Sequence, residues 1–258
     1  MSLKLLKISQ LALLFGLFFL SLQANGQVKI SQEKAGFPLF HAFYSFQLPG
    51  HDLTERFGSN SVIGTGFLYK TKYNLLLGVD GGLIFSENVR NKDQYLENIA
   101  TSEGYLISES GTFASVFLHE RGFYAGAKLG GIIPVFGPNP NSGLMILLGG
   151  GILQHKIRIE DTDNNTPQVF GDYKKGYDRL TNGPSISQFI GYIHFDNTRV
   201  INFHVGLELI QAWTRSLRPW DFDRMQPDTR KRFDTLWGIR LGWILPLYKR
   251  APQEYYYY

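Results

Sequence analysis

The stretch 201-INFHVGLELIQAW-213 decides the fold, because its apolar and polar residues alternate. A period of two is that of an extended β-strand, in which successive side chains point to opposite faces. The odd positions up to residue 209 form an apolar face, made by Ile201, Phe203, Val205, Leu207 and Leu209. The other face carries His204 and Glu208. The stretch therefore predicts a strand with one apolar face and one face that includes ionisable groups.

The same alternation recurs elsewhere in the chain. In 75–86 an apolar face is opposed by glycines and Asp80. In 235–247 an apolar face with Trp237 and Trp243 is opposed by two glycines and Arg240. These segments predict an antiparallel all-β protein.

Alternation alone does not distinguish a soluble β-sandwich from a barrel, but three features favour the barrel. Glycine is concentrated on the polar face, which suits a crowded barrel interior. Aromatic residues gather near strand ends, as in the girdles of an outer-membrane barrel. Short turns also alternate with long polar loops. The predicted turns are 72–74, 121–122 and 196–198, and the predicted loops are about 87–111, 161–184 and 214–234.

Nine segments have the pattern of a strand, an odd number where bacterial single-chain barrels have an even one. They are about 37–48, 61–70, 75–86, 112–119, 122–135, 143–160, 185–196, 199–213 and 235–247. One strand is therefore missed or one is false, and 137–184 is the most suspect stretch because turn residues and a glycine run interrupt it. We predict a transmembrane barrel of eight to ten strands.

The N-terminus predicts export. Lys4 and Lys7 precede an apolar run from Leu11 to Leu22, and a small-residue cleavage signal ends before Gln27. A retained helical anchor is the alternative, but a run of about a dozen residues is shorter than the roughly 20 that span a bilayer. We expect a cleaved signal peptide at 1–26, a periplasmic segment at 27–36, the barrel at 37–247 and a tail at 248–258. The expected location is the bacterial outer membrane.

Composition excludes several classes of site. The chain of 258 residues contains no cysteine, so disulfides, lipoprotein anchors and thiolate chemistry are absent. The formal charge of +4 falls to about +2 once Lys4 and Lys7 leave with the signal, and no basic run supports nucleic-acid binding. The six histidines fall singly, without the spacing of a zinc motif. We therefore expect no metal and no cofactor.

The final strand 236-LWGIRLGWILPLY-248, the glycine-rich and aromatic alternating body and the N-terminal signal carry a resemblance. The chain resembles the small outer-membrane β-barrel proteins of Bacteroidota, the superfamily with PorT-like and OmpA- or OmpW-like barrels. The resemblance implies recognition by the barrel-assembly machinery through an aromatic last strand. Here Pro246 interrupts that strand and the chain continues to a run of four tyrosines, so either segment could supply the signal.

Twelve residues on the polar faces are expected to point into the lumen. They are His41, Asp80, Tyr124, Lys128, Gln154, Lys156, Arg158, Glu160, Asn202, His204, Glu208 and Arg240. An eight-stranded barrel is only wide enough for side chains to fill it, and buried charges must pair. We therefore expect an ion-pair and hydrogen-bond network that plugs the barrel. A narrow pore for small solutes is the alternative.

An outer-membrane lipid-modifying enzyme, a deacylase or acyltransferase, is the other alternative. His204 and Glu208 are four residues apart on a strand, about 13 Å along its axis, so they cannot hydrogen-bond to each other. A triad would need a partner such as Ser187 or Ser45, and the G-x-S-x-G motif is absent. We expect no enzymatic activity.

The external loops and the tail are the candidate partner-binding regions. Arginines mixed with acids and a tryptophan in 214–234 are typical of a recognition surface, and arginine also suits lipopolysaccharide phosphates. The candidate residues are Arg215, Arg218, Trp220, Arg224, Tyr255, Tyr256, Tyr257 and Tyr258. The expected function is that of a structural or accessory component of envelope assembly or secretion. The expected partners are the lipid bilayer, lipopolysaccharide, the barrel-assembly machinery and another envelope protein, with no nucleic acid.

Overall fold

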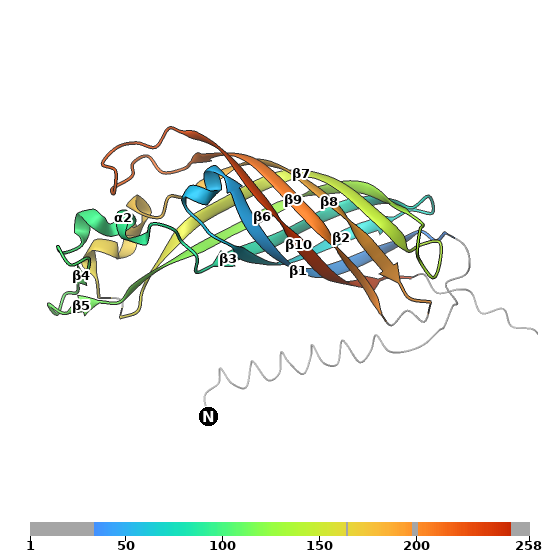
Figure 1. Ribbon diagram of the computed structural model, residues 1–258, viewed down its shortest axis with the longest axis horizontal. Coiled ribbons are helices and arrows are strands. Elements are labelled where there is room, and N and C mark those ends of the chain that lie inside the picture. The colour runs from blue at the N-terminus through green and yellow to red at the C-terminus, as the bar shows by residue number, and fades with distance from the viewer. Residues whose placement is uncertain (1–33, 164, 198–200, 249–258) are drawn as a thin grey trace, which may run out of the picture.

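The computed structural model describes residues 34–163, 165–197 and 201–248, and the predicted antiparallel barrel is confirmed (Figure 1). Eight strands close in the order β1-β10-β9-β8-β7-β6-β3-β2, and β2 pairs again with β1. The barrel strands are β1 (Phe37–His51), β2 (Asn60–Lys70), β3 (Leu75–Ser86), β6 (Val116–Ile133), β7 (Gly143–Asp161), β8 (Thr181–Phe195), β9 (Asn202–Ser216) and β10 (Lys231–Pro246).

The strand count corrects one sequence prediction. The segments 112–119 and 122–135 were expected to be two strands joined by a turn at Arg121-Gly122, but residues 116–119 and 122–133 lie in the single strand β6. The ladders with β3 and β7 run straight through Gly122, which pairs with Ile84 and His155. A Cβ at Gly122 would lie only 2.5 Å from the carbonyl oxygen of Gln154, so this glycine allows close approach of a neighbouring strand instead of a turn.

The suspect stretch 137–184 contains no extra barrel strand among its described residues. The glycine run 149–151 lies inside the continuous strand β7, and residues 171–176 form the 3-10 segment η4 (Gly171–Gly176). The false strand therefore came from a glycine within β6, and the even count is restored.

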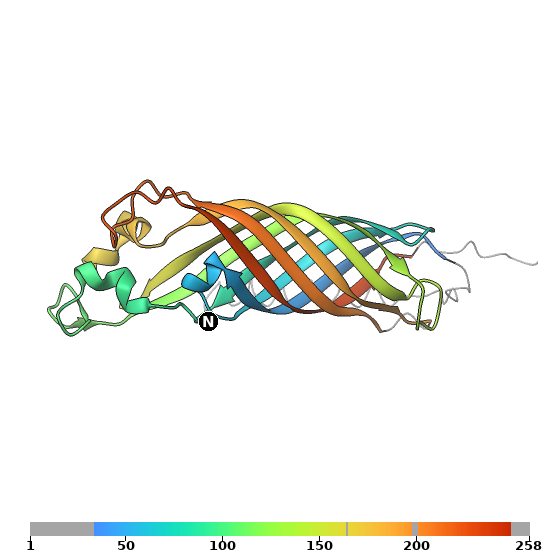
Figure 2. The ribbon, with the colours of Figure 1, turned by 45° about the horizontal axis from the view of Figure 1, so that its top comes forward.

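The two ends of the barrel differ, as predicted (Figure 2). One end has the connections 71–74, 134–142 and 196–201 and lies beside the first and last described residues. The other end has the connections 52–59, 87–115, 162–180 and 217–230, which contain the helices η1 (Asp52–Glu55), α2 (Lys92–Leu96), η2 (Glu97–Ile99), η3 (Pro167–Val169) and η4, and a small hairpin of β4 (Leu106–Ile107) and β5 (Phe113–Ala114). We call these ends the turn end and the loop end.

Burial follows the alternation of each strand. In β9, Leu207 exposes 58% of its surface on the outside, whereas Glu208 exposes 2% inside. The outer surface of the barrel is accordingly apolar, and its exposed residues include Ile63, Leu77, Val79, Leu83, Leu129, Leu148, Ile190, Leu207, Ile239 and Leu241. No helix of the described ranges combines the length and the hydropathy needed to cross a bilayer.

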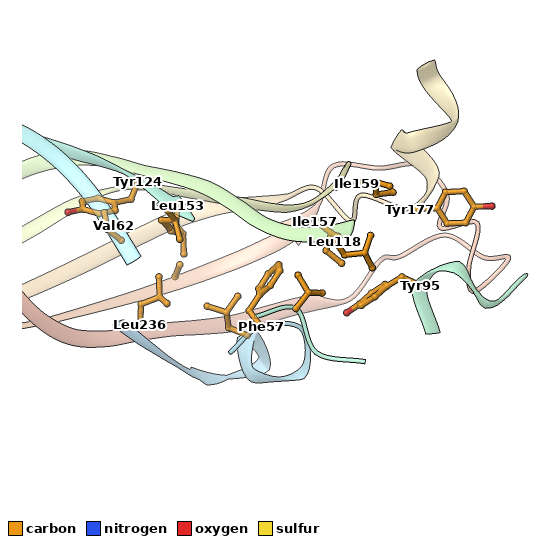
Figure 3. Packing of buried hydrophobic residues seen from close by; sticks show 14 of the residues in the cluster. Phe57, Val62, Tyr95, Leu118, Tyr124, Leu153, Ile157, Ile159, Tyr177 and Leu236 are labelled. Carbon is orange, nitrogen blue, oxygen red and sulfur yellow. The ribbon is translucent and has the colours of Figure 1, made fainter. Parts of the chain in front are cut away.

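Two hydrophobic clusters fill the ends of the interior. The loop-end layer, shown in part in Figure 3, is built from strand residues such as Leu153, Ile157 and Leu236 and is covered by loop residues such as Phe57 and Tyr95. The turn-end layer comprises Phe37, Leu39, Leu68, Leu76, Ile132, Met145, Leu147, Phe189, Ile193, Phe195 and Ile244. Polar residues lie between them, which defines the candidate site.

Candidate functional site: a charged interior and an ordered loop cap

Four ionised side chains from four strands meet in the middle of the barrel. Arg240 on β10 donates to a carboxylate oxygen of Asp80 on β3 at 2.9 Å and lies 3.3 Å from a carboxylate oxygen of Glu208 on β9. The Lys128 ammonium on β6 lies 3.5 Å from Asp80 and 3.4 Å from Glu208. Two cations thus face two anions, and we call this set the interior network.

Glycines create the space for these long side chains. In the strand register, Asp80 lies between Gly66 and Gly126, and Lys128 lies between Gly78 and Gly149. Glu208 lies opposite Gly238, and Arg240 lies opposite Gly206. An inward-facing glycine next to each charged residue leaves room for that side chain to cross the lumen. The pattern of glycines on the polar face therefore has a packing cause.

Neutral groups complete the contacts of the interior network. Lys128 donates to the Ser187 hydroxyl at 2.8 Å, and the Arg240 guanidinium donates to the Tyr124 hydroxyl. The guanidinium also lies 3.6 Å from the centre of the Phe43 ring, a cation–π contact. Two cations and two carboxylates balance in charge, which offsets part of the cost of their burial.

A histidine pair lies next to the interior network on its turn-end side. The rings of His41 and His204 are 5.3 Å apart and meet edge to face, and the Phe189 ring is 5.7 Å from His204. Their ring nitrogens have no hydrogen-bond partner among the described residues. His204 and Glu208 therefore belong to adjoining groups and do not act on each other.

Of the twelve residues expected in the lumen, the structure places eight inside. His41, Asp80, Tyr124, Lys128, Asn202, His204, Glu208 and Arg240 are all buried. The expectation is wrong for Gln154, Lys156, Arg158 and Glu160, which lie on the outer face of β7.

The reason for this correction is that β7 extends past the apolar outer belt at its loop end. There the outside meets water and the inside meets the loop-end layer, so the polarity of the two faces inverts. Leu153, His155, Ile157 and Ile159 are the buried residues of this part of the strand. A sequence read as one continuous alternation cannot show where that inversion occurs.

The loops at the loop end form an ordered cap tied by buried ion pairs. Arg56, in the β1–β2 loop, donates to the Thr181 hydroxyl at 2.8 Å and lies 3.5 Å from Asp228 in the β9–β10 loop. Arg232 donates to the same Asp228 carboxylate at 2.6 Å. Burial, together with the nearby Arg232 and Arg179, lowers the pKa of Arg56 to about 10. The guanidinium still carries its charge at neutral pH.

The remaining loops join the cap through further contacts. Arg179 pairs with Asp223, and Arg218 forms a bidentate pair with Asp178. The amide of Asn98 donates to the Phe222 carbonyl oxygen at 3.2 Å, which ties the β3–β6 loop to the β9–β10 loop. Sequence reasoning missed Arg56 and Arg179 because their partners lie in distant loops, and it missed Arg232, whose partner Asp228 is four residues away.

The residues predicted from the sequence to bind a partner differ in their accessibility. Arg218 is committed to Asp178, whereas Trp220 and Arg224 are exposed on the surface of the cap. Arg215 is exposed on the outer face of β9, directly opposite Lys231 of β10. The four terminal tyrosines, Tyr255 to Tyr258, lie outside the described residues, as do the signal peptide 1–26 and most of the segment 27–36.

A second buried polar group lies within the loop-end layer. His155 contacts a carboxylate oxygen of Asp234 at 3.0 Å, and the Thr214 hydroxyl donates to the same oxygen at 2.5 Å. All three side chains are buried, and Thr214 contacts the carboxylate instead of the imidazole. The group lacks an exposed nucleophile. No cluster of three or more histidine, aspartate or glutamate side chains suited to a metal occurs in the described residues.

Comparison with known proteins gives structural likeness only. No protein-family model and no curated protein matches the chain. Similar solved structures include Neisserial surface protein A, with 11% identity, a TM-score of 0.40 and coverage of 81% of this chain and 96% of that one. The attachment invasion locus protein Ail of Yersinia pestis has 11% identity and a TM-score of 0.38, with coverage of 82% of this chain and 99% of that one. The outer membrane protein OprG of Pseudomonas aeruginosa has 10% identity and a TM-score of 0.38, with coverage of 83% of this chain and 97% of that one.

Proposed function

We propose that the protein is an integral outer-membrane β-barrel with a filled lumen, which displays its loop cap to another component of the cell envelope. The observation that carries the proposal is the apolar belt around a closed barrel. Side chains such as Leu77, Leu129 and Leu148 each expose more than half of their surface on the outside. Water does not favour a continuous apolar surface around a whole domain, whereas a lipid bilayer does.

Backbone pairing supports the same proposal. Every barrel strand is hydrogen-bonded on both sides, so the sheet has no edge. A closed barrel is one of the two structures that satisfy all backbone groups in hydrocarbon. Two outward polar side chains, Gln188 and Gln211, share a hydrogen bond, which the Gln188 amide donates to the Gln211 carbonyl oxygen at 3.2 Å.

Aromatic residues lie toward the two ends of the belt, as expected for membrane interfaces. Trp213 and Phe233 contact each other on the loop-end side with ring centres 5.6 Å apart. Tyr69, Tyr73 and Trp243 are exposed on the turn-end side. Since outer-membrane barrels have short periplasmic turns and long external loops, we assign the loop end to the cell exterior. Export by the N-terminal signal and kinship with the Bacteroidota barrels are parts of this proposal.

The interior supports a structural role over a pore. The interior network crosses the lumen, and the loop-end and turn-end layers cover it on both sides. A conducting path would have to separate buried ion pairs and open two hydrophobic layers. Planar-bilayer recordings should therefore show no stable conductance, and a steady open channel in pure protein would contradict the filled lumen.

The loop cap supports partner binding over catalysis. A cap tied by buried Arg–Asp pairs presents a fixed surface, which limits the entropy lost on association. Exposed tryptophan and arginine, here Trp220 and Arg224, are residue types enriched at binding hot spots. The buried His155 group lies beneath the cap without an accessible nucleophile, so we propose no enzymatic activity and no cofactor.

The experiment that tests this function is purification from the membrane fraction in mild detergent. We expect heat-modifiable migration on electrophoresis and co-purification of another envelope protein. The double variant Trp220→Ala/Arg224→Ala should lose that partner and keep its heat-modifiable migration. Recovery of the native chain as a soluble periplasmic protein would overturn the membrane assignment, and unchanged partner recovery would overturn the role of the cap.

A further inference from the structure

Basic residues lie opposite one another on the outer face of β6 and β7, just beyond the apolar belt. In the strand register Arg121 pairs with Lys156, and the next outward-facing pair is His119 with Arg158. Directly opposite residues of antiparallel strands have Cβ atoms about 4.5–5.5 Å apart, and like charges there destabilise the sheet. The Arg121–Lys156 pair therefore favours a compensating anion at this place on the sheet.

The protein supplies little of that compensation. Arg121 donates to two backbone carbonyl oxygens, of Glu120 at 2.7 Å and of Ser86 at 3.5 Å. Among the described residues, neither Lys156 nor Lys174 has a carboxylate within the 4.0 Å of a salt bridge. Only the outer pair is partly neutralised, because Glu160 lies 3.5 Å from Arg158 and 3.9 Å from His119.

These cations line an open hollow of about 720 Å³. Arg121, Lys156 and Arg158 form its strand wall, and Lys174 of η4 contributes from the loop above. Three carboxylates, of Glu160, Asp161 and Asp178, also line the hollow. Glu160 lies against Arg158, Asp161 accepts a hydrogen bond from the Thr166 backbone N–H at 2.8 Å, and both oxygens of Asp178 are held by Arg218 at 2.7 and 2.5 Å. Four cations therefore face three carboxylates, one of which is already neutralised by Arg218, so the lining of the hollow has a net positive charge.

The hollow lies at the border of the apolar belt. Ile152, which is 49% exposed, precedes Lys156 by four residues on the same face, about 13 Å along a tilted strand. Phe85 of β3 lies directly opposite Arg121 and continues the apolar surface sideways. A lipid whose acyl chains pack against Ile152 and Phe85 would place its headgroup next to Arg121 and Lys156.

We propose that this hollow binds the phosphate of a lipid headgroup in the outer leaflet. Phosphate oxygens would accept hydrogen bonds from the Arg121 guanidinium and from the Lys156 and Lys174 ammonium groups, and would relieve the repulsion between the two strands. The inference rests on the proposed membrane insertion and adds a defined site and a ligand chemistry to it.

The test is native mass spectrometry of the full folded chain in detergent with equal amounts of lipid A and phosphatidylcholine. We expect the wild type to retain lipid A preferentially. The variant Arg121→Gln/Lys156→Gln should lower that preference about tenfold or more, since each cation near an anionic lipid contributes about a factor of five. The control Arg90→Gln/Lys92→Gln removes the same charge from an exposed loop and should keep the preference.

Three outcomes would overturn the proposal. Equal retention of both lipids by the wild type excludes the site, and so does an equal loss in the control and the Arg121/Lys156 variants. Displacement of lipid A by inorganic phosphate at millimolar concentration would assign the hollow to a free anion. Failure of the proposed membrane insertion would appear separately, as a chain without heat-modifiable migration in any detergent.

Discussion

Arg240 is the residue whose contacts join most of the interior network, since it contacts Asp80, Glu208, Tyr124 and Phe43. Arg240→Met should lower the free energy of unfolding by about 3–5 kcal/mol, because one cation would remain for two buried carboxylates. The double variant Arg240→Met/Asp80→Asn restores the balance and should recover part of the loss. Urea unfolding in detergent micelles measures both, and additive effects of the two changes would contradict the coupling.

Gly242 tests the proposed role of glycine in the lumen. A Cβ added at this position would overlap with the imidazole of His204 on the neighbouring strand. Gly242→Ala should therefore destabilise the barrel by about 1–3 kcal/mol, the usual range for overpacking. Adding His204→Ala should remove most of this cost, and the thermal midpoints of the two variants give the comparison. A double variant no more stable than the single one would show that the imidazole is not the obstacle.

Asp221 gives the loop cap a predicted pH dependence. Its carboxylate is buried and has no hydrogen-bond partner in the described chain, and burial raises its pKa above the ordinary 3.8. Between pH 3.8 and the raised pKa, the folded protein therefore binds more protons than the unfolded chain. The free energy of unfolding consequently decreases as pH rises through this range.

The variant Asp221→Asn removes that loss. Its thermal midpoint should exceed that of the wild type near pH 7, and the difference should shrink as pH falls toward 3.8. A difference that is constant across pH would mean that the carboxylate is not desolvated in the folded protein.

At the scale of the element, each strand shows which features the sequence could predict. Strand β9 was predicted almost to its ends, because its alternation continues while the two faces meet different surroundings. Strand β6 was divided in two, because Arg121-Gly122 has the composition of a turn and only the neighbouring strands show that it is paired.

The polar face of β7 was assigned to the lumen wrongly, whereas the polar faces of β6 and β9 were assigned correctly. The inward positions of Lys128 on β6 and Glu208 on β9 follow from the alternation of those strands. Lys156 and Arg158 lie outside because β7 leaves the apolar belt there, and local sequence does not encode where the belt ends. The loop pairs, such as Arg56 with Asp228, depend on chain folding over long separations and could not be predicted from spacing.

The orientation of β9 gives a direct prediction. Leu207→Arg places a charge on the outer face and should destabilise the folded barrel by about 2–4 kcal/mol if that residue lies near the bilayer centre. His204→Gln changes an inward residue without adding charge and should have a much smaller effect. The heat-modifiable fraction of each variant in lipid vesicles measures the difference, and equal tolerance of both would contradict the orientation.

At the scale of the whole molecule, the barrel is organised as layers from one end to the other. The turn-end layer, the histidine pair, the interior network, the loop-end layer and the loop cap follow in that order, and apolar side chains surround the middle of the barrel. This arrangement of layers closes the lumen, so contacts with other molecules are left to the apolar belt and the loop cap. The central claim is that the belt lies in lipid.

Tryptophan fluorescence tests this claim most directly, because three of the four tryptophans, Trp213, Trp237 and Trp243, are exposed on the outer face of the barrel, whereas Trp220 lies in the cap. We predict that vesicles of lipids brominated on their acyl chains quench most of the emission, and that the variant Trp220→Phe increases the quenched fraction. Emission unaffected by brominated lipid but quenched by aqueous acrylamide would show that the belt faces water and would contradict the account.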